Sequence, residues 1–351
     1  MKKMIFLFFC LITFKNVYAA PYEIVMDADS GRVLYSRNKD VKHYIASTTK
    51  IMSTLVVLNS CNLNDTVEIG EEVLDAYGSS IYIKPKEKMR VEDLLYGLML
   101  RSGNDAALAL AVHTAGTVEE FVKLMNKYAK EIKMYNTHFG NPHGLDDTPS
   151  NQSTVYDMAL LMQEAMKNDT FRKITSTKKY ITKSNFNTYE WHNKNELLKN
   201  YEYATGGKIG YTSLAKHTFV SSASKNGMNL IIASFEDKDR FNNHEKLYEK
   251  FFNDYKKYIL IDKNKLNIDY KKGYKLFTLE SFSMMLKDSE LDSVNREITL
   301  YENVTIGKDA TVIGNISISI NGTVYKKLNI YGEKQAHKNN FIEWLRGLFS
   351  W

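Results

Sequence analysis

Cysteine and proline are scarce in this chain, and each scarcity argues against a class of architecture. The 351 residues include two cysteines, Cys10 and Cys61, and only four prolines. Cys10 lies in an N-terminal apolar run that we expect to be removed, so the remaining chain cannot form an internal disulfide. Few prolines and no long low-complexity stretch argue against large disordered regions. We therefore expect a core large enough to fold without covalent cross-links.

Several catalytic signatures are also missing. The sequence has no H-E-x-x-H pair, no paired C-x-x-C and no glycine-rich phosphate loop, so we expect neither a metal centre nor a cofactor. It lacks a G-x-S-x-G turn, which argues against a Ser-His-Asp hydrolase. The eight histidines are scattered, and we expect four of them to be structural. These four are His43, His113, His192 and His217.

Composition and charge are ordinary for a globular protein. Hydrophobic residues make up 44% of the chain and charged residues 25%, with a formal net charge of +6. A surface of this kind permits a mild attraction to anionic lipids or wall polymers. We expect no nucleic-acid partner.

The N-terminus has the features of a secretory signal peptide. Lys2 and Lys3 precede an apolar run over residues 4–14, and small residues stand at the cleavage site before Ala20. The alternative is an uncleaved membrane anchor, but the run is shorter than the roughly 20 residues that a spanning helix needs. We therefore expect residues 1–19 to be removed and the protein to be exported to the outer face of a bacterial cytoplasmic membrane.

The C-terminus predicts an amphipathic helix with an aromatic face. Within residues 333–351, a polar stretch leads to a segment whose apolar side chains share one helical face. They are Phe341, Trp344, Leu345, Leu348 and Phe349. Helices of this kind suit a membrane interface, and the alternative is a helix that packs back onto the preceding domain.

The regular patterns between the two ends predict an α+β domain followed by a small all-β domain. Helices are expected over residues 47–59, 94–100, 106–115, 117–132, 156–166 and 242–258. Strands are expected over residues 22–27, 32–35, 208–212, 217–224 and 228–235. These strands would form one antiparallel sheet against which the helices pack. We place the first domain at residues 20–258 and the β domain at residues 259–332.

Five serines are followed three residues later by lysine, a spacing that puts both side chains on one face of a helix. A neutral lysine amine can then accept the serine proton, provided that burial or another cation lowers its pKa. Only Ser47, with Lys50, stands at the start of an apolar helix, where the helix dipole favours developing negative charge. The other four pairs begin at Ser36, Ser176, Ser213 and Ser222.

Two further short motifs are selected by their context in the same way. Among several S-x-N matches, only the one at Ser102 and Asn104 interrupts two apolar helices, where a polar loop has reason to enter a cleft. Among the K-x-G matches, only the one at Lys208 combines a glycine-rich approach with a following strand.

Residues 45–50, 100–107 and 206–212, in this order and spacing, resemble the three motifs of penicillin-recognising serine enzymes. Residues 141–146 resemble a loop of the low-molecular-mass D-alanyl-D-alanine carboxypeptidases, which belong to the penicillin-binding proteins. The resemblance implies the penicillin-binding/β-lactamase fold and removal of the terminal D-alanine from peptidoglycan stem pentapeptides. It also implies β-lactams as covalent inhibitors.

The resemblance implies a role for each matching residue. Ser47 would attack the carbonyl between the two D-alanines, and Lys50 would act as its base. Ser102 would protonate the departing amine, and Asn104 would hold the acyl chain and the Ser–Lys pair in register. The implied substrate-binding residues are Lys208, Gly210, Tyr211, Thr212 and Arg240. Backbone N–H groups of Ser47 and Tyr211 would form the oxyanion hole.

The third motif departs from the family pattern, because Ile209 stands where these enzymes usually carry threonine. A hydroxyl at this position can donate to the substrate carboxylate, and Thr212 could compensate for its loss. The departure leaves open a catalytically impaired wall-binding protein of the same fold. A β-lactamase would need a glutamate that activates the deacylating water. Glu131 lies near the part of the chain where such a glutamate would be expected, but the asparagine that usually accompanies it is missing. A transpeptidase, using an amine in place of water, also stays open.

Overall fold

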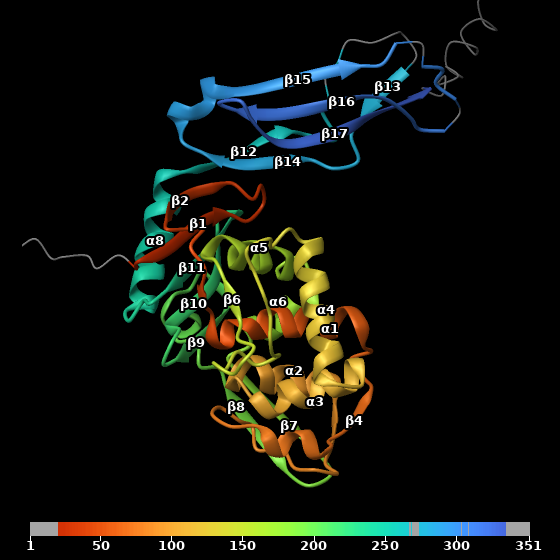
Figure 1. Ribbon diagram of the computed structural model, residues 1–351. Helices are drawn as coiled ribbons and strands as arrows, with labels where there is room; N and C mark the ends of the chain where they lie inside the picture. The colour runs from red at the N-terminus through yellow and green to blue at the C-terminus, as the bar shows by residue number, and fades with distance from the viewer. Residues whose placement is uncertain (1–19, 267, 269–273, 303, 308, 335–351) are drawn as a thin grey trace, which may run out of the picture.

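The computed structural model describes residues 20–266, 268, 274–302, 304–307 and 309–334. The expected signal peptide lies outside these residues, as does the expected amphipathic helix of the tail. The described chain forms a larger part built of helices and a sheet, with a smaller β part above it in Figure 1. None of the described helices is both long enough and apolar enough to cross a membrane.

The central sheet joins both ends of the first domain. Its strands are β1 (Tyr22–Asp27), β2 (Val33–Arg37), β9 (Ala204–Thr212), β10 (Lys216–Lys225) and β11 (Met228–Phe235). They are antiparallel in the order β2-β1-β11-β10-β9, which confirms the predicted sheet. Asn226 and Gly227 connect β10 to β11 with φ of 53° and 76°, the left-handed conformation that a two-residue hairpin turn requires.

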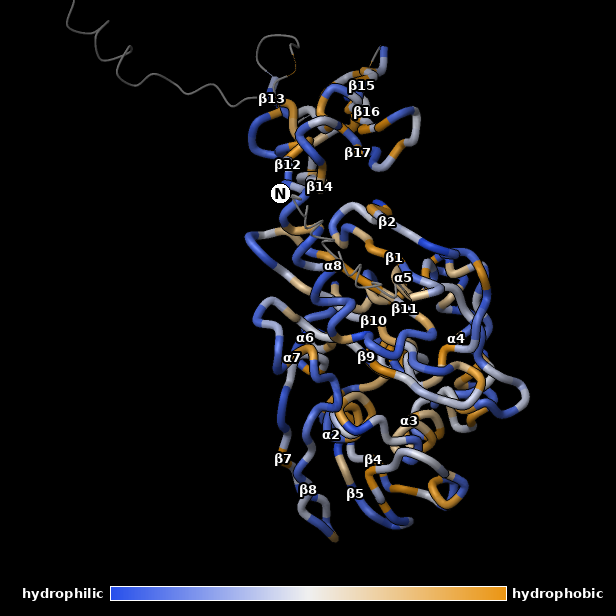
Figure 2. Tube along the Cα trace, turned by 90° about the vertical axis from the view of Figure 1, so that its left-hand side faces the viewer, coloured by the Kyte–Doolittle hydropathy of each residue, from blue (hydrophilic) through white to orange (hydrophobic). Residues whose placement is uncertain are grey.

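Helices cover both faces of this sheet. Side chains such as Met26 and Ile231 point into a large core against α1 (Lys50–Ser60), α5 (Val155–Ala165) and α6 (Asp169–Ser176). Their neighbours in the sequence, such as Val25 and Ile232, point to the opposite face and pack beneath α8 (Arg240–Asp254). The two layers of helices are visible on either side of the strands in Figure 1, and Figure 2 shows hydrophobic segments concentrated inside this arrangement.

The helices beside α1 complete the large core. They are η1 (Ala46–Thr49), α2 (Val91–Tyr96), η3 (Gly97–Arg101), α3 (Asn104–Ala115) and α4 (Val118–Glu131). Residues 50–57 of α1 are all buried, as its nearly continuous apolar sequence predicts. The hydroxyl of Thr117 accepts a hydrogen bond from the Glu120 N–H at 3.1 Å, so the predicted cap starts α4.

Short elements that the sequence analysis did not predict complete the domain. They are β3 (His43–Tyr44), β4 (Thr66–Glu68), η2 (Glu71–Asp75), β5 (Lys88–Arg90), β6 (Gln152–Ser153), β7 (Lys179–Lys183), β8 (Thr188–His192) and α7 (Leu197–Asn200). The pairs β3–β6, β4–β5 and β7–β8 each form a small antiparallel ladder. The β7–β8 hairpin lies at the end of the molecule opposite to the small β part (Figure 1).

The small β part has its own core. Its elements are β12 (Lys256–Ile261), β13 (Tyr274–Phe277), β14 (Phe282–Leu286), η4 (Asp288–Ser293), β15 (Val294–Leu300), β16 (Thr311–Ile320) and β17 (Thr323–Lys334). β12 pairs with β14, and the four remaining strands form a sheet in the order β13-β17-β16-β15. An apolar cluster that includes Ile316, Ile318 and Ile330 lies inside.

The predicted end of the last helix is wrong. The helix expected to reach Tyr258 ends at Asp254, and the chain enters β12 two residues later. The segment Lys256–Ile261 is rich in β-branched and aromatic residues, and its pairing with β14 favours the extended form. The Arg32–Glu290 ion pair joins the two parts, as does the hydrogen bond from the Met285 N–H to Asp27 Oδ2 at 3.0 Å.

Candidate active site

The serine and lysine of the first motif lie at the junction of η1 and α1. Ser47 is half-buried in η1, and Lys50, the first residue of α1, is completely buried. Lys50 Nζ is 3.0 Å from Ser47 Oγ, 2.8 Å from Asn104 Oδ1 and 2.6 Å from the His143 carbonyl oxygen. The amine is thus held by neutral groups and directed at the serine hydroxyl.

The electrostatic surroundings of Lys50 favour the uncharged amine. Burial lowers the pKa of Lys50 well below its usual value, and the positive charges of Lys208 and Lys194 lower it further. Asp105 opposes this effect, but the carboxylate does not hydrogen-bond to the amine. A neutral amine at hydrogen-bond distance from a hydroxyl is the arrangement that a general base for serine requires.

The second motif sits on a strained turn. Ser102 directly follows η3, a π-helical turn, and adopts a left-handed φ of 66° that is uncommon for a residue with a side chain. In the preceding turn Gly97 packs closely on its neighbours, because a Cβ there would lie 2.7 Å from the Ile81 side chain and 3.2 Å from Trp191. The turn brings Ser102 Oγ to 3.0 Å from Lys208 Nζ.

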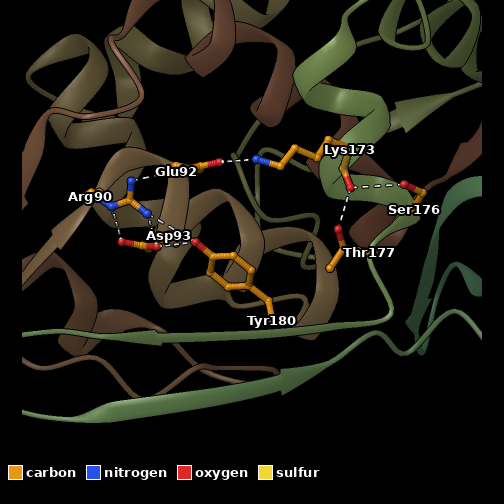
Figure 3. A network of polar contacts seen from close by, with 7 residues as sticks. All are labelled: Arg90, Glu92, Asp93, Lys173, Ser176, Thr177 and Tyr180. Atoms are coloured by element: carbon orange, nitrogen blue, oxygen red, sulfur yellow. Dashed lines mark hydrogen bonds and ion pairs between the residues drawn. The ribbon is translucent and has the colours of Figure 1, made fainter.

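A polar network fixes the base of this turn (Figure 3). Arg90 donates to both carboxylate oxygens of Asp93 on α2 at 3.0 Å, and the Tyr180 hydroxyl of β7 donates to Asp93 at 2.6 Å. Lys173 of α6 pairs with Glu92 at 3.1 Å. Because α2 continues directly into η3, these contacts anchor the Ser102 turn to the β7–β8 hairpin and to α6.

Asp105 and Asn104 hold the loop before α2. Asp105 accepts hydrogen bonds from the backbone N–H groups of Ile81 and Tyr82, at 3.0 and 2.7 Å. Asn104 Nδ2 donates to the Tyr77 carbonyl at 2.6 Å, which orients its Oδ1 toward Lys50. Asp105 directly follows the Ser-x-Asn residues of the second motif, but no motif pattern in the sequence singled it out.

The third motif lies on the edge strand β9. Lys208 is buried, and burial followed by the charge of Lys194 lowers its pKa to about 7. At Gly210 the strand passes so close to the nucleophile that a Cβ would lie 2.8 Å from the Ser47 nitrogen and 2.5 Å from Thr218 Oγ1. Glycine therefore permits the close approach of β9 to Ser47 directly before Tyr211.

The loop over residues 141–147 completes the surroundings of the nucleophile. Gly144 has a φ of 90°, and a Cβ there would lie 1.9 Å from the Ala46 carbonyl oxygen, so the loop packs directly on η1. Burial, with Lys50 as the second cause, lowers the pKa of the His143 side chain to about 3. His143 therefore contributes its backbone carbonyl as an acceptor for Lys50, and its ring stays neutral.

Two predicted substrate-binding residues, Thr212 and Arg240, have partners within the protein. Thr212 Oγ1 donates to Asp146 Oδ1 at 2.8 Å, so its single hydroxyl proton is not free to replace the threonine missing at position 209. This corrects the expectation that Thr212 could compensate. Arg240 begins α8, and its Nη1 lies 3.0 Å from His217 Nδ1.

A basic cavity of about 370 Å³ lies beside β9. Its lining includes Arg101, Lys194, Lys199, Ile209 and Arg240, with Glu196 as the one acidic residue. The buried Nε of Arg240 has no hydrogen-bond partner within the described part of the chain. Arg101 lies within residues 100–107 but is not a matched position of the second motif, and Lys194 belongs to no motif, so the sequence alone did not single out either residue. This concentration of positive charge suits an anionic ligand group.

Comparisons with known proteins agree with the motifs. The sequence pattern of one family, described as D-alanyl-D-alanine carboxypeptidase, matches residues 13–239. The chain is 31% identical to D-alanyl-D-alanine carboxypeptidase DacF of Bacillus subtilis, over 95% of this chain and 90% of that protein.

Two solved structures show the likeness in three dimensions. Penicillin binding protein 5 from Haemophilus influenzae matches with a TM-score of 0.75 at 28% identity, over 90% of this chain and 97% of that one. A mutant of a Streptomyces DD-transpeptidase matches with a TM-score of 0.64 at 33% identity, over 67% of this chain and 98% of that one. The predicted fold class, an antiparallel sheet with helices on its faces and a following β part, is confirmed. The chain therefore belongs to the D-alanyl-D-alanine carboxypeptidase family of serine peptidases.

Proposed function

We propose that this protein is a serine D-alanyl-D-alanine carboxypeptidase acting on peptidoglycan stem peptides. The observation that carries the proposal is the buried amine of Lys50, 3.0 Å from the Ser47 hydroxyl oxygen and without a carboxylate partner in the described chain. A lysine in this setting is poised as a base and not as a surface cation.

The proposed reaction begins with attack on the substrate. Lys50 accepts the proton of Ser47 as Oγ bonds to the carbonyl carbon between the two terminal D-alanines. The N–H groups of Ser47 and Tyr211 stabilise the negative charge on the carbonyl oxygen. Ser102 then passes its proton to the amine nitrogen and takes the proton held by Lys50, so that the C–N bond breaks, D-alanine leaves and Lys50 is uncharged again. Water hydrolyses the acyl-serine ester and returns a proton to Ser47.

Positive charge beside β9 would bind the terminal carboxylate of the substrate. We assign this role to Lys208 and Arg240, with Arg101 and Lys194 contributing from the lining of the basic cavity. A bound carboxylate would raise the pKa of Lys208, because a nearby negative charge favours the protonated amine. Substrate binding would thus convert Lys208 into a cation while Lys50 stays uncharged.

A transpeptidase is the second candidate, since one structural relative bears that name. It would share every step up to the acyl-enzyme and would then use an amine in place of water. A β-lactamase has less support. Glu131 lies exposed at the end of α4, and none of the hydrogen bonds described for the site joins it to Ser47 or Lys50.

We place the protein outside the cytoplasmic membrane, in the periplasm or the cell-wall space. The support is the sequence pattern of residues 1–19, which is typical of a signal peptide. The aromatic face of residues 341–351 would bind the membrane surface reversibly. From this position the enzyme would trim wall peptides and influence cell shape.

Covalent labelling by benzylpenicillin tests the proposal. Intact mass should increase by one benzylpenicillin, and peptide mapping should place the adduct on Ser47. Ser47→Ala should abolish labelling, whereas Ser36→Ala should leave it unchanged, because Ser36 lies exposed on β2 although it shares the S-x-x-K spacing. Release of D-alanine with and without an added amine separates the two candidate activities, and nitrocefin turnover tests for a β-lactamase. An adduct on another serine would refute the mechanism.

A further inference from the structure

Asp146 ties the exposed end of β9 to the loop that packs on the nucleophile. Its Oδ1 accepts a hydrogen bond from the Thr212 hydroxyl at 2.8 Å, and its Oδ2 accepts one from the Leu214 N–H at 3.2 Å. The Ala215 N–H in turn donates to Thr212 Oγ1 at 3.0 Å. Both oxygens of one carboxylate are therefore used to hold the turn between β9 and β10.

The same loop holds the proposed base. Three residues before Asp146, the His143 carbonyl oxygen accepts a hydrogen bond from Lys50 Nζ at 2.6 Å. Between them, Gly144 packs against the Ala46 carbonyl group and its N–H donates to Asn141 Oδ1 at 2.7 Å. The loop is thus fixed to η1 at one end and to the β9–β10 turn at the other.

The position of this turn matters because Tyr211 directly precedes Thr212. An oxyanion-hole donor must lie about 2.7–3.1 Å from the developing negative charge, so a small displacement of the strand weakens it. Tyr211 and Leu214 are 61% and 50% exposed, so this end of β9 is held on one side by its ladder with β10 and the contact of Tyr211 with His217, and on the other by the bonds to Asp146. At Gly210 the strand already touches Ser47, so an outward shift would open the gap between the two proposed donors.

We propose that Asp146 is a positioning residue that holds the Tyr211 N–H in register with the Ser47 N–H. The inference rests on the proposed function, because it assumes that these two N–H groups stabilise the negative charge that develops on the substrate carbonyl oxygen during acylation. Asp146 acts through the β9–β10 turn and touches neither substrate nor nucleophile. Its loss should slow the chemical step more than it weakens substrate binding.

Acylation by benzylpenicillin and hydrolysis of a D-Ala-D-Ala peptide test this role in the full-length protein. Asp146→Ala should lower the acylation rate and kcat by roughly ten- to a hundredfold, as expected for a weakened oxyanion donor, with KM changed less than about threefold. Asp146→Asn keeps one acceptor for Thr212 and should restore most of the rate. Thr212→Val, which removes the donor from the other side, should act in the same direction. Asp169→Ala is the matched control, because this carboxylate is exposed on α6 and paired with Arg172.

A spectroscopic readout separates positioning from a general loss of structure. The acyl carbonyl stretch of isotope-labelled penicilloyl-enzyme should move to higher wavenumber in Asp146→Ala, because a weaker hole polarises the ester less. An unchanged stretch with a wild-type acylation rate would overturn the inference. So would a rate loss that merely follows a lowered melting temperature while the stretch stays unchanged. If wild-type protein forms no acyl-enzyme, the proposed function itself fails, and the inference fails with it.

Discussion

A threonine introduced at position 209 would give the third motif the hydroxyl it lacks. Ile209 is half-buried and lines the basic cavity together with Arg101, Lys194 and Arg240. A hydroxyl there could donate to a substrate carboxylate held by these cations. A hydrogen bond to a charged group contributes about 1.5–3 kcal/mol, which corresponds to roughly a ten- to hundredfold change in kcat/KM. Because the proposed carboxylate site already contains Lys208, Arg240, Arg101 and Lys194, we expect the lower end, about tenfold.

The same substitution should lower stability slightly. Ile209 packs against the apolar cluster under α8, with Phe241 beside it. Replacing part of a half-buried aliphatic side chain with a hydroxyl costs about 1 kcal/mol. For a domain of this size, the melting temperature should fall by about 2–4 °C. A gain in activity with a small loss in stability is therefore the expected pair of results.

Ile209→Val is the matched control, since valine has the shape of threonine without the hydroxyl. Release of D-alanine from diacetyl-Lys-D-Ala-D-Ala and the rate of benzylpenicillin acylation should increase in the threonine variant and not in the valine variant. Equal changes in both would show that the hydroxyl contributes nothing. A threonine variant slower than the valine variant would refute the carboxylate contact. If wild type and the threonine variant both show neither hydrolysis nor acylation, the results would favour a catalytically impaired wall-binding protein.

Two further predictions concern pH and membrane binding. Burial, with Lys194, lowers the pKa of Lys208 to about 7 in the folded protein, whereas an unfolded lysine keeps about 10.4. Between these pH values the unfolded chain binds a proton at Lys208 that the folded protein does not. The free energy of unfolding should therefore rise with pH by up to about 1.4 kcal/mol per pH unit from this group. Denaturant titrations of Lys208→Met at several pH values should show a shallower rise. Deleting residues 341–351 should release the protein from membranes without changing its activity on soluble peptide. A truncated protein that still sediments with membranes after signal-peptide removal would exclude the tail as the anchor.

Local patterns predicted the parts of the fold that depend on neighbouring residues. The apolar run after Ser47 indicated a buried helix, and Asn226–Gly227 indicated the hairpin between β10 and β11. The spacing of Ser47 and Lys50 predicted side chains on one face, and their atoms lie 3.0 Å apart. Each of these features is set within a few residues, where propensity and periodicity are informative.

Contacts between distant segments could not be predicted in this way. The β7–β8 hairpin was missed because its alternation is largely polar, and its place depends on Tyr180 reaching Asp93, 87 residues earlier. Asp146 and Thr212 are 66 residues apart, and no local pattern relates them. The predicted end of α8 was also wrong. The hydrophobic periodicity continues past Asp254 and favours a helix there, but pairing with β14 makes the segment a strand.

The two buried lysines show how the structure adds chemistry that the motifs do not contain. Lys50 contacts Asn104 across 54 positions of the chain, and Lys208 contacts Ser102 across 106. Each amine is buried among neutral acceptors, and Lys208 is one of the charges that lower the pKa of Lys50. Lowering the pKa of both buried amines costs folding free energy at neutral pH, because the unfolded chain holds both lysines protonated. In the proposed mechanism, a substrate carboxylate at Lys208 would remove the part of that cost that belongs to Lys208 and would leave Lys50 as the uncharged base, so two lysines with similar burial would serve opposite purposes.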